Sequence, residues 1–109
     1  MDLVSKAREL GIEISKSDKF IEYKNLYNQV YKDEKNKEMI DDFRKKVVDY
    51  QLNYANKGKE SEEELKKLEN LQNIMMMNQD LGKFLIAETN FSIELKDIYE
   101  AIEKELELE

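Results

Sequence analysis

Cysteine, histidine, proline and tryptophan are all absent from this chain of 109 residues. Without cysteine there is no disulfide, thiolate metal site, iron–sulfur cluster or cysteine nucleophile. Without histidine the chain lacks the commonest general base and metal ligand, and a histidine-dependent catalytic triad cannot form. These absences predict a protein that is not an enzyme and that holds no cofactor and no structural metal.

Arginine is also scarce, since Arg8 and Arg44 are the only two among 18 basic residues. The 25 acidic residues give a net charge of −7, all of it carried by residues 57–109. An acidic chain gains nothing from attraction to phosphate, so direct binding of nucleic acid is disfavoured. No apolar run approaches the ~18 residues of a membrane helix, and residues 1–4 lack a secretory pattern. We therefore expect a cytoplasmic protein.

The composition that is present favours long helices. Charged residues make up 39% of the chain, against about 25% in an average domain. Disorder is the rival interpretation of so polar a chain, but 40% of the residues are hydrophobic and they recur at helical spacing. The length predicts a single helical domain over residues 1–109. The pattern predicts four to five helices, over about residues 2–14, 18–32, 34–55, 61–78 and 81–106.

Two of the joints between these segments are open to interpretation. Asp33 is either the start of the third helix or part of a continuous one, and the chain near Asn78 either ends a helix or bends it. The turn before residue 61 is clearer, because Gly58 suits a left-handed helix end. Ser61 and Glu64 then read as a capping box, with the Ser61 hydroxyl accepting from the Glu64 amide and the Glu64 carboxylate reaching back.

Two apolar rows recur in alternating steps of three and four, which is the spacing of a helix packed lengthwise on another. A last helix over residues 81–106 would be ~39 Å long, which exceeds the ~26 Å diameter of a compact domain of this size. The sequence therefore predicts an all-α, elongated hairpin or bundle completed by dimerisation. The predicted interface residues lie on the third and last helices: Phe43, Val47, Tyr50, Phe84, Glu88, Phe91, Leu95 and Ile98.

Glu88 is the one charged residue in these rows. It is either buried and paired with Arg44, Lys45 or Lys46, or it lies at the edge of the seam in water. Clusters of neighbouring carboxylates elsewhere favour a solvated acidic face, since the usual di-metal bundle site needs histidine.

Tyrosines and methionines leave two further alternatives. Tyrosines spaced four apart could stack on nucleic-acid bases, but packing with each hydroxyl at the rim is favoured. They are Tyr23, Tyr27 and Tyr31, then Tyr50 and Tyr54. The run Met75–Met77 is either an adaptable peptide-binding patch or filler beside the joint near Asn78.

Several short motifs, taken in order, resemble the YlbF/YmcA/YheA family of small bacterial helical proteins. They are Ser17-Asp18-Lys19-Phe20, Lys24-Asn25-Leu26-Tyr27, Val30, Asp33-Glu34, Met39, Phe43-Arg44, Leu85-Ile86-Ala87-Glu88, Phe91, Leu95 and Ile98. The resemblance covers roughly residues 3–106 and is closest to the YheA branch.

The resemblance implies an all-α homodimer built on a long helical hairpin, with no catalytic residues. YlbF and YmcA act with a third protein in a complex that affects RNA processing, competence, sporulation and biofilm formation. This chain lacks the cysteine-bearing extension linked to iron–sulfur binding in that complex, so cluster binding is not carried over. We expect an interaction protein with protein partners. The alternative is an RNA-associated accessory protein that uses Lys45, Lys46 and the tyrosines.

Overall fold

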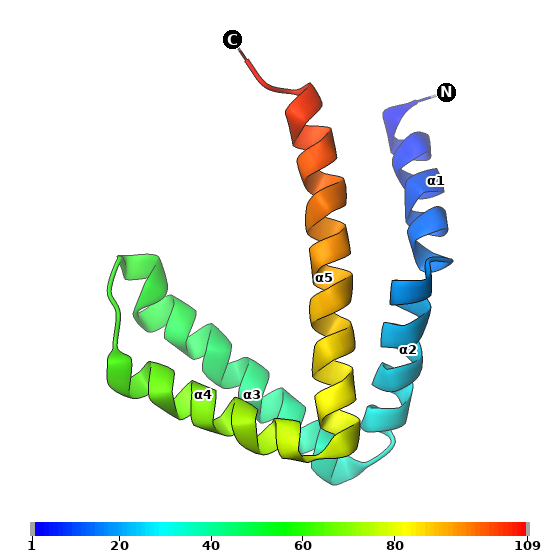
Figure 1. The fold of residues 1–109 in the computed structure, drawn as a ribbon. Helices are drawn as coiled ribbons and strands as arrows, with labels where there is room; N and C mark the ends of the chain where they lie inside the picture. Colours follow the sequence, from blue (N-terminus) through cyan, green and yellow to red (C-terminus); the bar gives the residue numbers. More distant parts are fainter. Residues whose placement is uncertain (1, 109) are drawn as a thin grey trace. The chain divides into compact units, whose positions relative to one another are not determined.

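The computed structural model describes residues 2–108, which form five α-helices and a short 3-10 helix (Figure 1). Among these residues there is no strand, so the all-α prediction is confirmed. The helices are α1 (Leu3–Ser15), α2 (Asp18–Tyr31), α3 (Glu34–Asn53), α4 (Glu62–Met77) and α5 (Gln79–Glu105), with the 3-10 helix η1 at Ala55–Lys57. The order matches the five segments expected, and α5 begins two residues earlier than expected, at Gln79.

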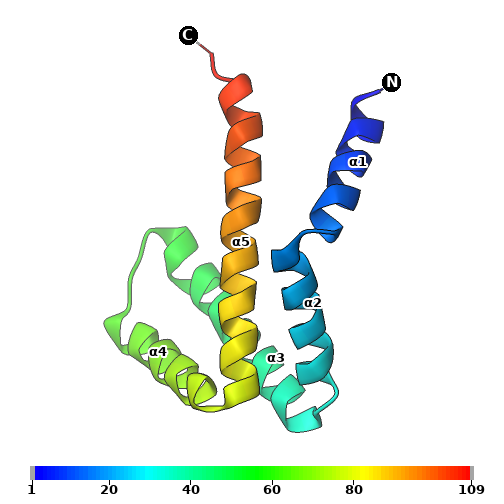
Figure 2. The same ribbon diagram turned by 45° about the vertical axis from the view of Figure 1, so that its right-hand side comes forward.

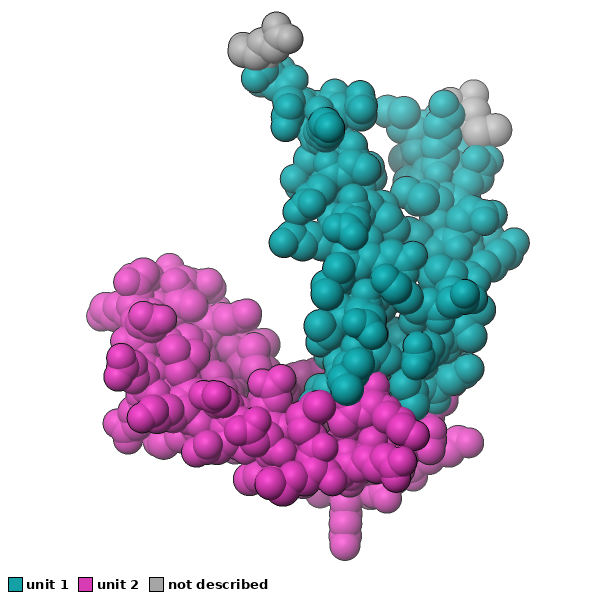
Figure 3. Space-filling view, viewed as in Figure 1, with its two compact units in different colours: residues 1–27, 84–109 teal, residues 28–83 magenta. Residues whose placement is uncertain are grey.

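The chain divides into two compact units (Figure 3). Unit 1 comprises residues 1–27 and 84–109, and unit 2 comprises residues 28–83. In unit 1, α1 and the first part of α2 run alongside α5 in the opposite direction, so both chain ends lie at one end of that unit (Figures 1 and 2). In unit 2, α3 and α4 form an antiparallel hairpin closed by η1. That residues 1–109 behave as a single domain stays a prediction.

Polar side chains begin the helices and settle the two uncertain joints. The Asp33 carboxylate accepts hydrogen bonds from the amides of Lys35 and Asn36 at 2.9 and 3.2 Å. The Asn78 side chain does the same for Asp80 and Leu81 at 3.0 and 3.2 Å. Each side chain satisfies amides that the first turn of a helix leaves unpaired. A new helix therefore starts after each of these two residues.

Asp2 caps α1 in the same way, since its carboxylate accepts from the Ser5 amide at 2.7 Å. This hydrogen bond from Ser5 lowers the pKa of Asp2 below its ordinary value.

The turn between α3 and α4 is the one predicted, except for half of the capping box. Gly58 has φ +69°, the left-handed conformation that glycine adopts without a Cβ penalty. The Ser61 hydroxyl accepts from the Glu64 amide at 3.3 Å, as expected. The Glu64 carboxylate instead pairs with Lys67 at 3.2 Å, and the Ser61 amide donates to the Tyr50 hydroxyl at 3.1 Å. The prediction of a reciprocal hydrogen bond from the Ser61 amide to the Glu64 carboxylate was wrong, because the Tyr50 hydroxyl accepts from that amide instead.

Ser61→Ala is expected to lower the free energy of unfolding by about 0.5–2 kcal/mol, because it removes the hydroxyl that caps α4. Tyr50→Phe is the companion variant, since it removes only the acceptor of the Ser61 amide. Urea melts of both proteins measure the two contributions. A change of about 0.2 kcal/mol or less for Ser61→Ala, which is below the range of such caps, would show that the hydroxyl does not support the helix.

Fully buried apolar side chains are few and lie in the middle of the chain. In unit 2 they are Val30, Ile40, Met75 and Leu81, and in unit 1 they are Phe84 and Ala87. Each large side chain among them contributes about 1.5–3 kcal/mol when it is fully removed from water. No residue of α1 is buried, and none of α5 is buried after Ala87. Much apolar surface of unit 1 is therefore left exposed.

Candidate interaction surface

Five aromatic rings join α2 to α5 inside unit 1. Tyr23 stacks on Phe84 and on Phe91, with ring centroids 5.6 Å apart in each case. Phe20 lies 5.2 Å from Phe91, and Tyr27 lies 6.2 Å from Phe84. Such pairs stabilise by about 0.5–1.5 kcal/mol beyond the area that they bury. Phe84 and Phe91, which the sequence analysis assigned to an interface, therefore pack α5 against α2 within unit 1.

Glu88 lies beside this aromatic cluster. It is half-buried, and its Oε2 accepts a hydrogen bond from the Tyr23 hydroxyl at 3.3 Å. Placing a carboxylate away from water is costly unless a donor meets it. The structure supplies a neutral tyrosine donor, which the sequence analysis did not consider.

The predicted interface residues fall into two sets. Phe84, Glu88, Phe91, Leu95 and Ile98 lie on α5 in unit 1, and Phe43, Val47 and Tyr50 lie on α3 in unit 2. All are half-buried except Phe84, which is fully buried. Phe84 is therefore covered within its own chain and does not need the second chain that the sequence analysis assigned to it. An interface role for the other members stays a prediction.

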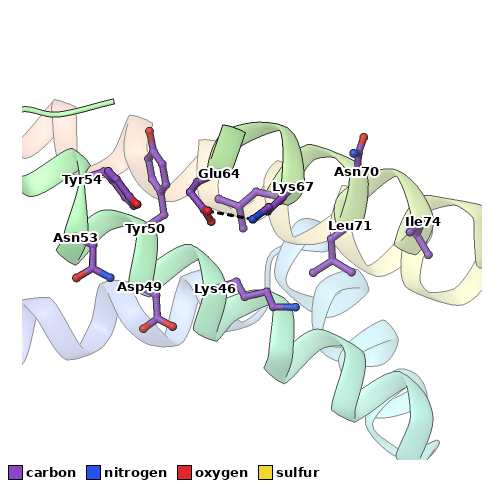
Figure 4. Close-up of a pocket in the computed structure, with 11 residues that line it drawn as sticks. Lys46, Asp49, Tyr50, Asn53, Tyr54, Glu64, Lys67, Asn70, Leu71 and Ile74 are labelled. Atoms are coloured by element: carbon purple, nitrogen blue, oxygen red, sulfur yellow. Dashed lines mark hydrogen bonds and ion pairs between the residues drawn. The ribbon is translucent and has the colours of Figure 1, made fainter. Parts of the chain in front are cut away.

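A groove of about 670 Å³ runs between α3 and α4 in unit 2 (Figure 4). Its apolar lining comes mainly from Leu68, Leu71 and Ile74, and Tyr50 and Tyr54 stack at one end with centroids 5.1 Å apart. Polar side chains complete the lining: Lys46, Asp49, Asn53, Glu64, Lys67 and Asn70. The sequence analysis named Lys46 and Glu64 in other roles, and it did not name Asp49, Asn53, Lys67 or Asn70. The pattern that could have predicted this lining is the recurrence of polar residues in steps of three and four on both helices, next to the apolar rows.

Charges along this groove are partly paired within the hairpin. Lys46 binds Asp42 at 2.9 Å, and Lys67 binds Glu64 at 3.2 Å. The hydrogen bond and the attraction of Glu64 raise the pKa of Lys67 above its ordinary value. Both pairs are exposed, so each adds little to stability.

The tyrosines are engaged within the chain, as the packing interpretation expected. Tyr23 and Tyr27 belong to the aromatic cluster of unit 1. The Tyr31 hydroxyl donates to Asp41 and accepts from Arg44, each at 3.4 Å, and Tyr50 accepts from the Ser61 amide. These contacts leave little basis for a stacking platform.

The three methionines have separate environments. Met75 is fully buried, whereas Met76 is 41% and Met77 85% exposed. Met75 therefore fills space before the break at Asn78, and the other two face outward.

Within residues 2–108 no group of three or more acidic side chains is placed to hold a metal ion. In the same part of the chain no helix is long and apolar enough to cross a membrane.

A family model described as control of competence regulator ComK, YlbF/YmcA, matches residues 3–107. The chain belongs to the YlbF/YmcA family. A UPF0342 protein of Halothermothrix orenii is 31% identical over 108 residues, which cover 99% of this chain and 92% of the relative. A UPF0342 protein of Clostridium novyi is 29% identical and covers 95% of this chain and 91% of the relative. Placement in the YheA branch of the family stays a prediction.

Two solved structures share the fold of this YlbF/YmcA family member. A protein of unknown function (DUF964) from Bacillus stearothermophilus has a TM-score of 0.80 at 22% identity, covering 95% of this chain and 91% of that one. Bacillus subtilis RicA, solved in complex with RicF, has a TM-score of 0.59 at 22% identity, covering 92% and 89%. At this identity the likeness shows the fold alone.

Proposed function

We propose that this protein is a non-catalytic, cytoplasmic interaction protein that acts in a bacterial regulatory complex. The YlbF/YmcA family description, control of a competence regulator, supports a regulatory role. RicA, which shares the fold, was solved in complex with RicF, which supports a protein partner. Roles in RNA processing, sporulation and biofilm formation belong to the same proposal and follow from the resemblance to the family.

The observation that carries this proposal is the exposed apolar surface of unit 1. Over α1 and the part of α5 after Ala87, no side chain is buried. Large apolar residues are nonetheless present, such as Leu3 at 82% and Leu106 at 71% exposure. Contiguous exposed apolar surface marks sites where proteins bind one another. Binding, not catalysis, is what such a surface supports.

We also propose that the protein is a homodimer. Of the interface predicted from sequence, Phe43, Val47 and Tyr50 on α3 and Phe91, Leu95 and Ile98 on α5 are half-buried and can lose further exposed area to a partner. The proposal keeps Glu88 among these residues, with its carboxylate bound to Tyr23 of the same chain, and keeps Phe84 as the buried support of the α5 row. A twofold partner would match the row of each helix to the same row of its copy.

RNA binding through Lys45, Lys46 and the tyrosines has less support. Lys46 is paired with Asp42, and the tyrosine rings pack within the chain. The net charge of −7 opposes it as well.

Wild-type protein at tens of micromolar is expected to sediment at twice its mass of 13.0 kDa. Affinity capture from native cells under mild cross-linking is expected to recover a defined protein partner. The control for the capture is a dimer-defective variant at equal expression. A folded 13.0 kDa monomer that recovers the same proteins as an unrelated bait would contradict the proposal.

A further inference from the structure

The N-terminal helix α1 is the one α-helix of the described chain without a buried side chain. Each of the other four contributes at least one fully buried residue, such as Val30 in α2. On α1 the exposed fraction is 82% at Leu3 and 39% at Leu10. Only Ser5 and Ile14 of this helix are half-buried. Helices in proteins owe most of their stability to the packing of an apolar face, so α1 lacks the main source of that stability.

Polar contacts do not attach α1 to another helix either. Within residues 2–108 every hydrogen bond of an α1 residue joins partners no more than four positions apart, and none of the ion pairs involves α1. By contrast, α2 is held on α5 by the hydrogen bond from Tyr23 to Glu88 and by the contact of Phe20 with Phe91. Unfolding of α1 leaves these contacts in place.

The sequence of α1 also favours its unfolding. Gly11 lies inside the helix, and a Cβ at this position would meet no atom within 4 Å. Glycine weakens a helix because it loses the most backbone freedom on folding, and here no close contact requires its small size. Apart from the capping Asp2, α1 lacks charges that would oppose its dipole, since its first turn holds no acidic residue and its last turn no basic one. An isolated helix of 13 residues is marginal in water.

The joint at Ser17 allows α1 to unfold without α2. The Ser17 hydroxyl accepts a hydrogen bond from the Phe20 amide at 3.3 Å, so the first turn of α2 has a cap of its own. In the part of the chain that the structure describes, no amide of α2 donates to a carbonyl of α1. Figure 2 shows the break between the two helices. The hydrogen bonds of α2 therefore do not depend on α1.

We propose that α1 is an arm that unfolds and refolds on its own while the rest of the chain stays folded. The arm comprises residues 3–13, and the half-buried Ile14 marks its end. A partner that binds α1 as a helix must first order it, so the helical fraction of the free arm sets the affinity without any contact at the binding site. The arm behaves in this way whichever partner the protein has, and in this respect the inference goes beyond the proposed function.

Amide hydrogen exchange of the whole chain tests the arm directly. The amides of α1 are expected to be protected less than about a hundredfold, because the helix opens locally. Those of α5 around Phe84 are expected to be protected about five thousandfold or more, because they open only when the fold is lost. Exchange in α1 is also expected to depend little on urea, since opening an exposed helix uncovers little new surface.

Gly11→Ala is expected to raise the protection of α1 about two- to fivefold, because alanine favours the helix and its Cβ meets no neighbour. Asp2→Ala is expected to lower that protection about fivefold, because the cap on the Ser5 amide is lost. The matched control is Gly82→Ala, which makes the same change in α5. A Cβ at Gly82 would lie 3.2 Å from the Met76 carbonyl oxygen, and the protection of α1 is expected to stay unchanged.

Measurements at two protein concentrations separate the arm from contacts between copies. Low protection of α1 at low micromolar protein that rises at tens of micromolar would show that a second copy orders the arm, which supports the inference. Protection of α1 as high as that of α5 at both concentrations would overturn it. A Gly11→Ala variant whose α1 protection changes no more than that of Gly82→Ala would also overturn it, as would equal urea dependence of exchange in α1 and α5.

Discussion

Phe84→Ala is expected to lower the free energy of unfolding by about 3–5 kcal/mol, the largest effect of a truncation in unit 1. Phe84 is fully buried and its ring lies 5.6 Å from Tyr23 and 6.2 Å from Tyr27. Truncation removes these contacts and leaves a cavity that the two helices cannot close by a small shift. Urea melts at one fixed protein concentration measure the loss.

Ile86→Ala is the control, because Ile86 lies on the same helix and is 52% exposed. Its effect is expected to stay within about 1 kcal/mol, as is usual for a surface site. Equal losses for the two variants would mean that Phe84 does not hold α2 on α5. Phe84→Leu is expected to restore part of the stability, since it refills most of the volume.

Phe91→Asp is expected to cost about 3 kcal/mol or more and to unfold unit 1 in a marginally stable chain. The change removes a ring 5.2 Å from Phe20 and 5.6 Å from Tyr23. It also puts a carboxylate one helical turn from Glu88, where like charges repel. Circular dichroism melts and sedimentation of the same sample report folding and mass together.

Ile93→Asp is the matched control, because Ile93 is 50% exposed and lies two residues away on a different side of α5. It is expected to keep the wild-type fold. A Phe91→Asp variant with an unchanged melting temperature would show that the aromatic cluster does not support unit 1. A variant that stays fully folded but becomes monomeric would instead show that Phe91 acts at the interface, as the sequence alone suggested.

Helix positions followed closely from local chemistry. Asp2, Asp33, Ser61 and Asn78 each accept amide hydrogen bonds at the start of a helix, and such side chains act within three residues of themselves. The left-handed Gly58 likewise needs only its own backbone. The sequence is sufficient for features like these because both partners are neighbours along the chain.

Contacts between distant residues were harder to predict. The amphipathic rows correctly marked which side of α5 is apolar, but they could not say whether that side meets α2 or another molecule. The Tyr23–Glu88 hydrogen bond joins residues 65 positions apart, and the Ser61–Tyr50 bond replaced the expected reciprocal cap. Periodicity reports a side of a helix, and it carries no information on which element covers that side.

The sequence by itself determined four to five helices with most of their caps, a net negative charge without histidine or cysteine, and a resemblance to the YlbF/YmcA family that the family model bears out. Only the tertiary structure decided how the apolar rows are used. It buried Phe84 against the tyrosines of α2 and left Ile102 and Leu106 exposed on the same row. The physical reason is length, because α5 has 27 residues and its partner helices within unit 1 bury only its first part.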